Sequence, residues 1–231
     1  MRALTYAITG MLLVASAVAQ QPPASTSGES SSLSTQRDKA SYALGMSMGT
    51  SLRKQSVEIN PNVLMQGLKD AMAGGKTLMT EDEARSVLLQ LQQQKMKEVA
   101  QKNLYEGDKF LAENKMRSGV VVMPSGLQYK VLVAGNGSKP MLTDTVVCNY
   151  RGTFINGTEF DSSYKTGQPV TFAVNQVIRG WTEALQIMPV GSKWQLFIPP
   201  QLAYGEQGAG DDIPPNATLI FEVELVSIQR R

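Results

Sequence analysis

The first third of the chain places apolar residues at helical spacing behind three helix-start signals. Thr35 and Asp38 have the spacing of a capping box, and Thr80 and Glu83 form a second one. Asn60 is a typical N-cap, and the proline after it occupies the first helical position. The pattern therefore predicts two short helices and, after Thr80, a longer third helix.

The two short helices carry an apolar face that is rich in glycine and methionine. The residues concerned are Gly45, Met46, Met48, Gly49, Met65 and Met72. Glycine lets helices approach closely, and methionine fills irregular gaps. Such short helices cannot bury this face alone, so we expect residues 35–80 to form a homodimerisation domain. An internal core and a surface that binds unfolded clients are the alternatives.

The third predicted helix covers residues 81–118 and is thinly apolar. Beyond an initial stripe that ends at Leu91, its apolar residues are scattered, and its acidic and basic residues balance. A helix of this composition has no continuous apolar stripe with which to face a core. We interpret it as a solvent-exposed helix that connects two domains.

After Pro124 the hydrophobic period changes to the alternation that is typical of β-strands. Asn156-Gly157, between two apolar runs, is a strong hairpin signal. A short helical pattern begins at Trp181, and it is the candidate cover for a sheet with one solvated face. The strand-like runs lie at 126–133, 145–163, 168–174, 192–199 and 217–228. Residues 119–231 are therefore predicted to form an α+β domain, a curved antiparallel sheet wrapped around one short helix.

The composition excludes several kinds of active site. The 231 residues include no histidine and one cysteine, Cys148. Ser-His-Asp and Cys-His catalysis, His-ligated metals, an internal disulfide and a thiolate metal cluster are thereby excluded. We expect no cofactor and no metal, and we interpret Cys148 as a buried, inert thiol. With 22 Lys and Arg against 20 Asp and Glu, the charge gives no reason to expect nucleic acid as a partner.

Residues 1–19 have the pattern of an export signal. Arg2 precedes an apolar stretch with small residues, and Ala17-Val18-Ala19 is an A-x-A cleavage pattern. A membrane anchor is the alternative, but the apolar run is short and contains Thr, Tyr and Ser. Residues 20–34 are rich in Gln, Pro, Ser and Thr, as disordered spacers are. We expect a periplasmic protein, or one that is secreted or associated with the outer membrane, with no membrane span after signal cleavage.

Several motifs of the C-terminal half occur together in one known family. In chain order they are Tyr-x-Gly, Phe-Asp-Ser-Ser, Val-Ile-x-Gly-Trp, Ala-Tyr-Gly and Ile-Pro-Pro-Asn-Ala-Thr-Leu. From about Ser125 to its end, the sequence resembles the FKBP-type peptidyl-prolyl cis-trans isomerases. The helical half is similar to the dimerisation region of their exported bacterial members, the macrophage infectivity potentiator-like proteins. The resemblance implies an enzyme that accelerates Xaa-Pro isomerisation in exported proteins and aids their folding, with chaperone activity.

The same resemblance implies roles for individual residues. Trp181 would form the floor of a pocket for the prolyl ring, and Gly180 would let the chain turn toward that pocket. The Ile178 N–H and the Tyr204 hydroxyl would bind carbonyls, and Asp161 would orient polar groups. The walls would be Tyr150, Phe160, Val177 and Phe221, and the further substrate contacts would be Ile213 and Val170. The implied partners are proline-containing unfolded or partly folded polypeptides and macrolide inhibitors.

Such a pocket needs neither a nucleophile nor a metal. Amide resonance gives an Xaa-Pro bond a rotation barrier of roughly 18–20 kcal/mol, so isomerisation takes tens of seconds or longer. Twisting the C–N bond lowers the polarity of the amide, so an apolar pocket favours the twisted state. A chain with no histidine and one cysteine can perform this chemistry.

The loop before the last strand departs from the small family members. Ala209 stands where an aromatic residue or histidine is common, and Asp211-Asp212 where an apolar residue is common. Substrate preference and macrolide affinity are therefore open. A chaperone that binds prolyl segments without turnover is an alternative function. An acid hydrolase that pairs Asp161 with one of these aspartates is disfavoured, because the pocket has few polar groups.

Overall fold

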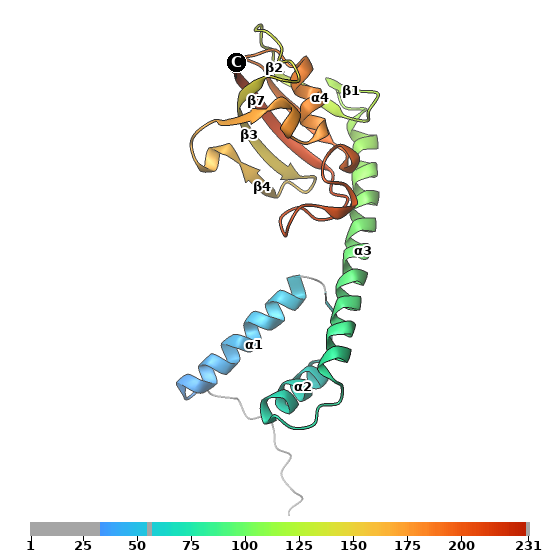
Figure 1. The fold of residues 1–231 in the computed structure, drawn as a ribbon, viewed down its shortest axis with the longest axis vertical. Coiled ribbons are helices and arrows are strands. Elements are labelled where there is room, and N and C mark those ends of the chain that lie inside the picture. Colours follow the sequence, from blue (N-terminus) through green and yellow to red (C-terminus); the bar gives the residue numbers. More distant parts are fainter. Residues whose placement is uncertain (1–32, 55–56, 230–231) are drawn as a thin grey trace, which may run out of the picture. The chain divides into compact units, whose positions relative to one another are not determined.

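The computed structural model of the protein describes residues 33–54 and 57–229 (Figure 1). The predicted export signal and most of the predicted spacer lie outside the described residues. The chain divides after Thr77 into a helical unit and a larger unit that begins at Leu78. The division falls between the second and third helices, so the third helix belongs to the larger unit.

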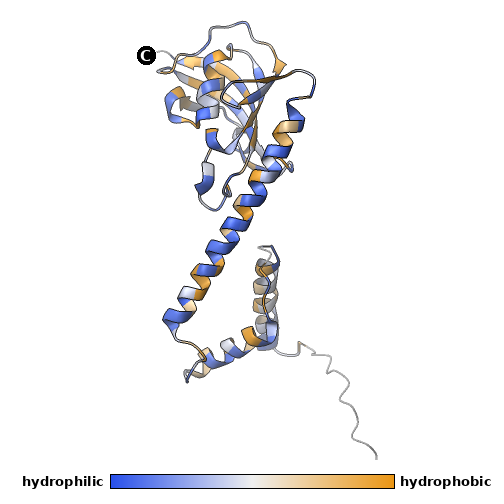
Figure 2. Cartoon of the chain, turned by 90° about the vertical axis from the view of Figure 1, so that its right-hand side faces the viewer, coloured by the Kyte–Doolittle hydropathy of each residue, from blue (hydrophilic) through white to orange (hydrophobic). Residues whose placement is uncertain are grey.

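The helical unit contains α1 (Gln36–Lys54) and α2 (Pro61–Ala73). Both predicted start signals are confirmed. The Asp38 N–H donates to Thr35 Oγ1 at 3.1 Å, and the Asn60 side chain accepts from two N–H groups in the first turn of α2. Neither helix buries a residue, and both apolar and hydrophilic residues occur along them (Figure 2).

The larger unit is built on a seven-stranded sheet whose strand pairs are all antiparallel. The order along the sheet is β1-β2-β6-β7-β3-β4, and β5 also pairs with β3. The strands are β1 (Val120–Val122), β2 (Gln128–Val133), β3 (Thr145–Phe154), β4 (Glu159–Ser162), β5 (Val170–Ala173), β6 (Lys193–Ile198) and β7 (Leu219–Gln229). The predicted fold class is confirmed. β1 was not predicted, because a three-residue strand is too short to show alternation.

The predicted hairpin joins β3 and β4. Gly157 has a φ of 85°, a left-handed conformation that glycine adopts without strain. Asn156 Oδ1 accepts a hydrogen bond from the Thr158 N–H at 2.9 Å, which closes the turn. Strand β7 shows the predicted alternation, since its buried positions are Leu219, Phe221, Val223 and Leu225. The hairpin and β7 together bring the phenylalanines of β4 and β7 to one face of the sheet.

Helix α4 (Arg179–Ile187) packs against the sheet and buries Gly180, Trp181, Ala184 and Leu185. It begins two residues before the predicted start, with Gly180 inside its first turn. An alanine Cβ at Gly180 would lie 2.6 Å from Ile198 Cγ2 on β6. The prediction that Gly180 serves a chain turn was therefore wrong. Its lack of a side chain lets α4 approach β6.

Four short 3₁₀ helices complete the larger unit. They are η1 (Ser163–Lys165), η2 (Val174–Gln176), η3 (Pro200–Leu202) and η4 (Gly205–Gln207). The segment η2 leads into α4, and η3 and η4 lie in the loop between β6 and β7. The first connection borders the first turn of α4, and the second borders the last strand. Both lie beside the region that holds the predicted site residues.

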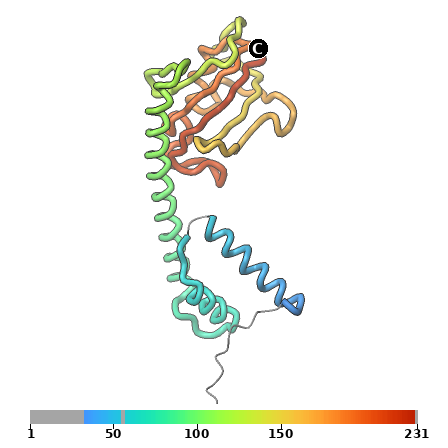
Figure 3. The backbone as a smooth tube through the Cα atoms, turned by 180° about the vertical axis from the view of Figure 1, so that it is seen from behind, coloured from blue at the N-terminus to red at the C-terminus, as the bar shows by residue number. Residues whose placement is uncertain are grey.

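Helix α3 (Glu81–Asn114) starts at the predicted capping box, in which Thr80 and Glu83 bond each other's backbone N–H. Its C-terminal part buries Gly107, Leu111 and Asn114. The expectation of a solvent-exposed helix is therefore wrong for this part. Seen from behind, α3 runs beside the sheet and the loop that precedes β7 (Figure 3).

Two contacts fix the end of α3 to the sheet. The Phe110 ring lies 5.9 Å from the Phe197 ring of β6, between centroids. The Asn114 amide donates to Gln128 Oε1, and the Gln128 amide donates to the Leu111 carbonyl, both at 2.9 Å. Both amide side chains are buried. A buried amide pair of this kind is costly to separate, because each group would lose its partner away from water.

Candidate active site

Trp181 stands at the centre of a group of aromatic rings. It lies in the first turn of α4, and 4% of its surface is exposed. Its ring centroid is 5.4 Å from Tyr150, 5.3 Å from Phe221 and 5.5 Å from Phe172, with interplanar angles between 71° and 87°. Edge-to-face contacts of this kind stabilise aromatic pairs beyond the area they bury. We call Tyr150, Phe160, Phe172, Trp181 and Phe221 the aromatic cluster.

The indole N–H of Trp181 is buried and has no hydrogen-bond partner among the described residues. Buried indole N–H groups usually find a partner, because leaving one unpaired is costly. Trp181 thus carries a donor that the described part of the chain does not use.

Gly152 lets the β3–β4 side of the cluster close. The Phe160 and Phe221 ring centroids are 5.5 Å apart and nearly perpendicular. An alanine Cβ at Gly152 would lie 2.6 Å from Phe160 Cζ and 2.9 Å from Phe221 Cε1. Those distances are shorter than van der Waals contact, so the glycine of the Tyr-x-Gly motif is required by packing. The motif thus combines Tyr150, whose hydroxyl is a hydrogen-bond donor, with a glycine that leaves space for the Phe160 and Phe221 rings.

Asp161 is exposed and accepts two hydrogen bonds. The Tyr150 hydroxyl donates to its Oδ2 at 2.6 Å, and the Ser162 N–H donates to its Oδ1 at 2.8 Å. Burial, then the hydrogen bond to Asp161, raises the pKa of Tyr150 above its usual value. Burial, then the charge of Asp161, also raises the pKa of Tyr204. Both phenols therefore stay protonated at neutral pH and can act as donors.

The segment before α4 carries the two aliphatic residues predicted for the site. The Ile178 carbonyl accepts from the N–H groups of Trp181 and Thr182, at 2.9 and 3.0 Å. Within the described residues, no hydrogen bond uses the Ile178 N–H. Val177 packs against the core and also lines a cavity of about 410 Å³ beside α4. The backbone here offers a donor next to the aromatic cluster.

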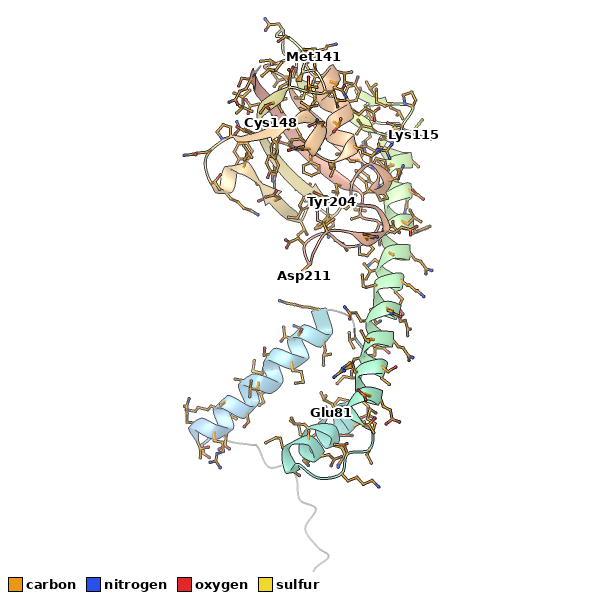
Figure 4. All side chains as sticks on the ribbon, viewed as in Figure 1. Glu81, Lys115, Met141, Cys148, Tyr204 and Asp211 are labelled. Atoms are coloured by element: carbon orange, nitrogen blue, oxygen red, sulfur yellow. The ribbon has the colours of Figure 1, made fainter. Side chains whose placement is uncertain are left out.

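The loop between β6 and β7 carries the remaining predicted residues. Tyr204 is 41% exposed, and Figure 4 shows it nearer the sheet than Asp211, which lies toward the tip of the loop. Ile213 is buried and is bonded through its backbone to Ala209 in both directions. The loop thus exposes Tyr204 to solvent and buries Ile213 in the core.

Sequence reasoning missed Phe172, whose ring contacts both Tyr150 and Trp181. The predicted Val170 lies on the same strand, paired with Cys148. The alternation of the run 168–174 places residues 170 and 172 on one face of the strand. That signal could have identified Phe172.

Two family models match the chain. FKBP-type peptidyl-prolyl cis-trans isomerase matches residues 136–226, and the domain amino-terminal to FKBP-type peptidyl-prolyl isomerase matches residues 37–131. The outer membrane protein MIP of Legionella longbeachae is 44% identical over 100% of this chain and 98% of its own length. The peptidyl-prolyl cis-trans isomerase Mip of Coxiella burnetii is 46% identical over 99% of this chain and 98% of its own. The chain belongs to the FKBP-type peptidyl-prolyl cis-trans isomerases.

The fold of this isomerase also matches solved structures. The crystal structure of FkpA from Escherichia coli aligns with a TM-score of 0.66 at 37% identity, over 86% of this chain and 99% of that one. A further relative, the 22 kDa FKBP-type isomerase of Escherichia coli, is 44% identical over 82% of this chain and 94% of its own length. None of the described helices is long and apolar enough to cross a membrane.

The described residues offer this isomerase little for covalent chemistry. Cys148 is buried, and burial raises the pKa of its thiol to about 12, so it is protonated at neutral pH. Among the described residues, no three His, Cys, Asp or Glu side chains group to hold a metal. The aromatic cluster supplies apolar ring surface, the Tyr150 hydroxyl and the unpaired Trp181 N–H. Tyr204, Asp161 and Ile178 add a second hydroxyl, a carboxylate and a backbone N–H.

Proposed function

We propose that the aromatic cluster binds the prolyl ring of an Xaa-Pro segment and lowers the barrier to rotation about its amide bond. The supporting observation is Trp181, which is buried and met nearly edge-on by Tyr150, Phe172 and Phe221. A planar amide is more polar than a twisted one. A binding surface of ring carbon therefore costs the planar state more solvation than the twisted state.

In this proposal the polar groups bind the substrate on either side of the amide bond that rotates. The Ile178 N–H and the Tyr204 hydroxyl donate to substrate carbonyls. Asp161 accepts the Tyr150 hydroxyl and thereby fixes its orientation. Val177, Ile213 and Val170 contact the substrate around the ring. Positioned donors of this kind restrict the substrate to conformations close to the twisted state.

Exchange of an Xaa-Pro peptide, measured by NMR with the full chain, tests the catalytic proposal. We expect the cis and trans resonances to exchange much faster in the presence of the protein. A parallel assay of aggregation suppression separates catalysis from binding. If suppression is normal but exchange is not accelerated, the protein is a prolyl-binding chaperone and the catalytic proposal fails.

The helical unit is proposed to form a homodimer. Most large apolar side chains on α1 and α2 are at least 40% exposed in the single chain, among them Leu44, Met46, Leu64, Leu68 and Met72. Soluble proteins seldom leave a contiguous apolar surface of this kind uncovered. A second copy would cover it and would leave two isomerase sites free to act on one client.

Light scattering on the protein from residue 20 onward tests the dimer. We expect a mass of two chains, because the apolar faces of α1 and α2 would otherwise be exposed to water. A mass of one chain would contradict the dimer and would favour the client-binding alternative for the same surface. A Leu68→Asp variant, which places a charge on this face, is expected to yield the mass of one chain.

The cellular setting and the ligands are also proposals. We place the protein in the bacterial periplasm or at the outer membrane, where it acts on proline-containing unfolded or partly folded polypeptides. The export pattern of residues 1–19 and the relative that is named an outer membrane protein support this location. Macrolide inhibitors are proposed to occupy the aromatic cluster in place of the prolyl ring.

A further inference from the structure

One face of α3 holds the loop that carries Tyr204 and Ile213. The Asn103 amide donates to the Pro215 carbonyl at 2.8 Å, and the Asn216 amide donates to the Ala100 carbonyl at 3.5 Å. One turn further along α3, Gly107 packs so closely on Thr218 that an alanine Cβ would overlap its hydroxyl. The α3 residues concerned are three and four positions apart, so they share one face of the helix.

The contacted segment is the C-terminal stem of this loop, and the stem is bonded to the residue after Tyr204. Asn216 is the one non-glycine residue among the described residues with a positive φ, at 55°. In that conformation its N–H donates to the Gly205 carbonyl at 2.8 Å, while its side chain reaches α3. A single residue thus connects the helix to the backbone beside Tyr204.

Within the loop, a second tie brings Ile213 into the same arrangement. The Ala209 N–H donates to the Ile213 carbonyl at 2.8 Å, and the Ile213 N–H donates back to the Ala209 carbonyl at 3.1 Å. Gly208, with a φ of 67°, lies against the Ile213 carbonyl, where a Cβ would overlap it. The loop therefore holds its own shape, and the described contacts attach its stem to α3.

We infer that Asn103 is a positioning residue for the isomerase site: α3 sets the place of Tyr204 and Ile213 by holding the stem at Pro215 and Asn216. The inference rests on the proposed function of the aromatic cluster. It extends the site beyond the sheet, since residues 100–107 lie on the connecting helix α3. A change in the position of α3 would therefore be transmitted to the loop that carries Tyr204 and Ile213.

The physical reason is the exposure of Tyr204. Tyr204 is 41% exposed, so packing alone does not fix the position of its hydroxyl. Loosening the stem lets the loop sample other positions, and substrate binding must then select the productive one. The loss should therefore appear chiefly as a raised KM, with a smaller fall in kcat.

The test compares Asn103→Ala with Gln101→Ala in the full-length protein. Gln101 is an exposed amide on the same helix, away from the loop contacts. We expect Asn103→Ala to lower kcat/KM for an Xaa-Pro peptide on the order of fivefold. Amide hydrogen exchange in residues 205–213 should become faster, and Gln101→Ala should change neither quantity. Circular dichroism is expected to show the helix content of the wild type in both variants, because alanine favours helices.

A double-mutant cycle with Tyr204→Phe distinguishes positioning from a general structural effect. If Asn103 acts through the loop, removing the hydroxyl should lower kcat/KM by a smaller factor in the Asn103→Ala background than in the wild type. The same cycle with Phe160→Ala, on β4, should be additive. Additive effects in both cycles, or unchanged loop exchange and kcat/KM in Asn103→Ala, would overturn the inference. A wild-type protein without isomerase activity would instead overturn the proposed function.

Discussion

Asp161→Ala should lower kcat/KM for Xaa-Pro peptides about tenfold or more while the protein stays folded. The carboxylate accepts the Tyr150 hydroxyl at 2.6 Å, and hydrogen bonds to charged groups contribute about 1.5–3 kcal/mol, where about 1.4 kcal/mol corresponds to a factor of ten. Without it the hydroxyl turns freely and the charge beside Tyr204 is lost. Since Asp161 is exposed, its removal leaves no cavity. Peptide isomerase kinetics and a urea unfolding curve check both parts.

Two further variants refine this prediction. Asp161→Asn keeps an oxygen that can accept the Tyr150 hydroxyl but removes the charge, so its loss of kcat/KM should be smaller than that of Asp161→Ala. Asp108→Asn removes an exposed carboxylate from α3 and should leave kcat/KM unchanged. Full activity in Asp161→Ala would remove this carboxylate from the catalytic proposal.

Gly180→Ala should destabilise the protein by about 1–3 kcal/mol, the usual cost of overpacking a core. In a solvent-exposed helix the same substitution stabilises by about 1 kcal/mol. Here the added methyl would lie 2.6 Å from Ile198 Cγ2 and 3.0 Å from Cδ1, so α4 must move away from β6. Trp181 follows Gly180 directly, so kcat/KM should fall as well. Urea unfolding followed by Trp fluorescence measures the change in the free energy of unfolding.

Ile198 supplies the control for this prediction. Ile198→Ala alone destabilises by leaving a cavity, but it removes all three atoms that an alanine at residue 180 would meet. In that background the cost of Gly180→Ala should shrink or change sign, as expected for substitutions that share one space. An equal cost in both backgrounds would show that Gly180 is needed for a reason other than its contact with β6.

Local signals in the sequence identified most of the secondary structure. Asn60 and the following proline mark the start of α2, and Gly74, with a φ of 64°, caps its end. The Asn156-Gly157 hairpin and the alternation of β7 were equally readable. Each of these signals acts over a few residues, so its outcome does not depend on the rest of the fold.

The features that the sequence did not reveal depend on distant contacts. Phe110 follows Asp108 and Lys109 in the sequence, and nothing local announces its contact with the Phe197 ring, 87 positions further on. Asn103 looked like one more polar residue on an exposed helix, because its partner lies 112 positions away. In the site, the family motifs contain Tyr150, Phe160 and Trp181, whereas Phe172 lies outside them. Long-range packing leaves little trace in local periodicity.

The buried amide pair at the end of α3 has a mechanical consequence. Asn114 and Gln128 hold the last turns of α3 against the sheet. The C-terminal end of the helix therefore cannot rotate relative to the sheet. Residues 81–106 contain neither glycine nor proline, so this stretch has no residue at which helices usually kink. The helix of 34 residues measures about 50 Å at 1.5 Å per residue. The start of α3 therefore moves together with the sheet, because the stretch between them lacks a residue at which a helix usually kinks.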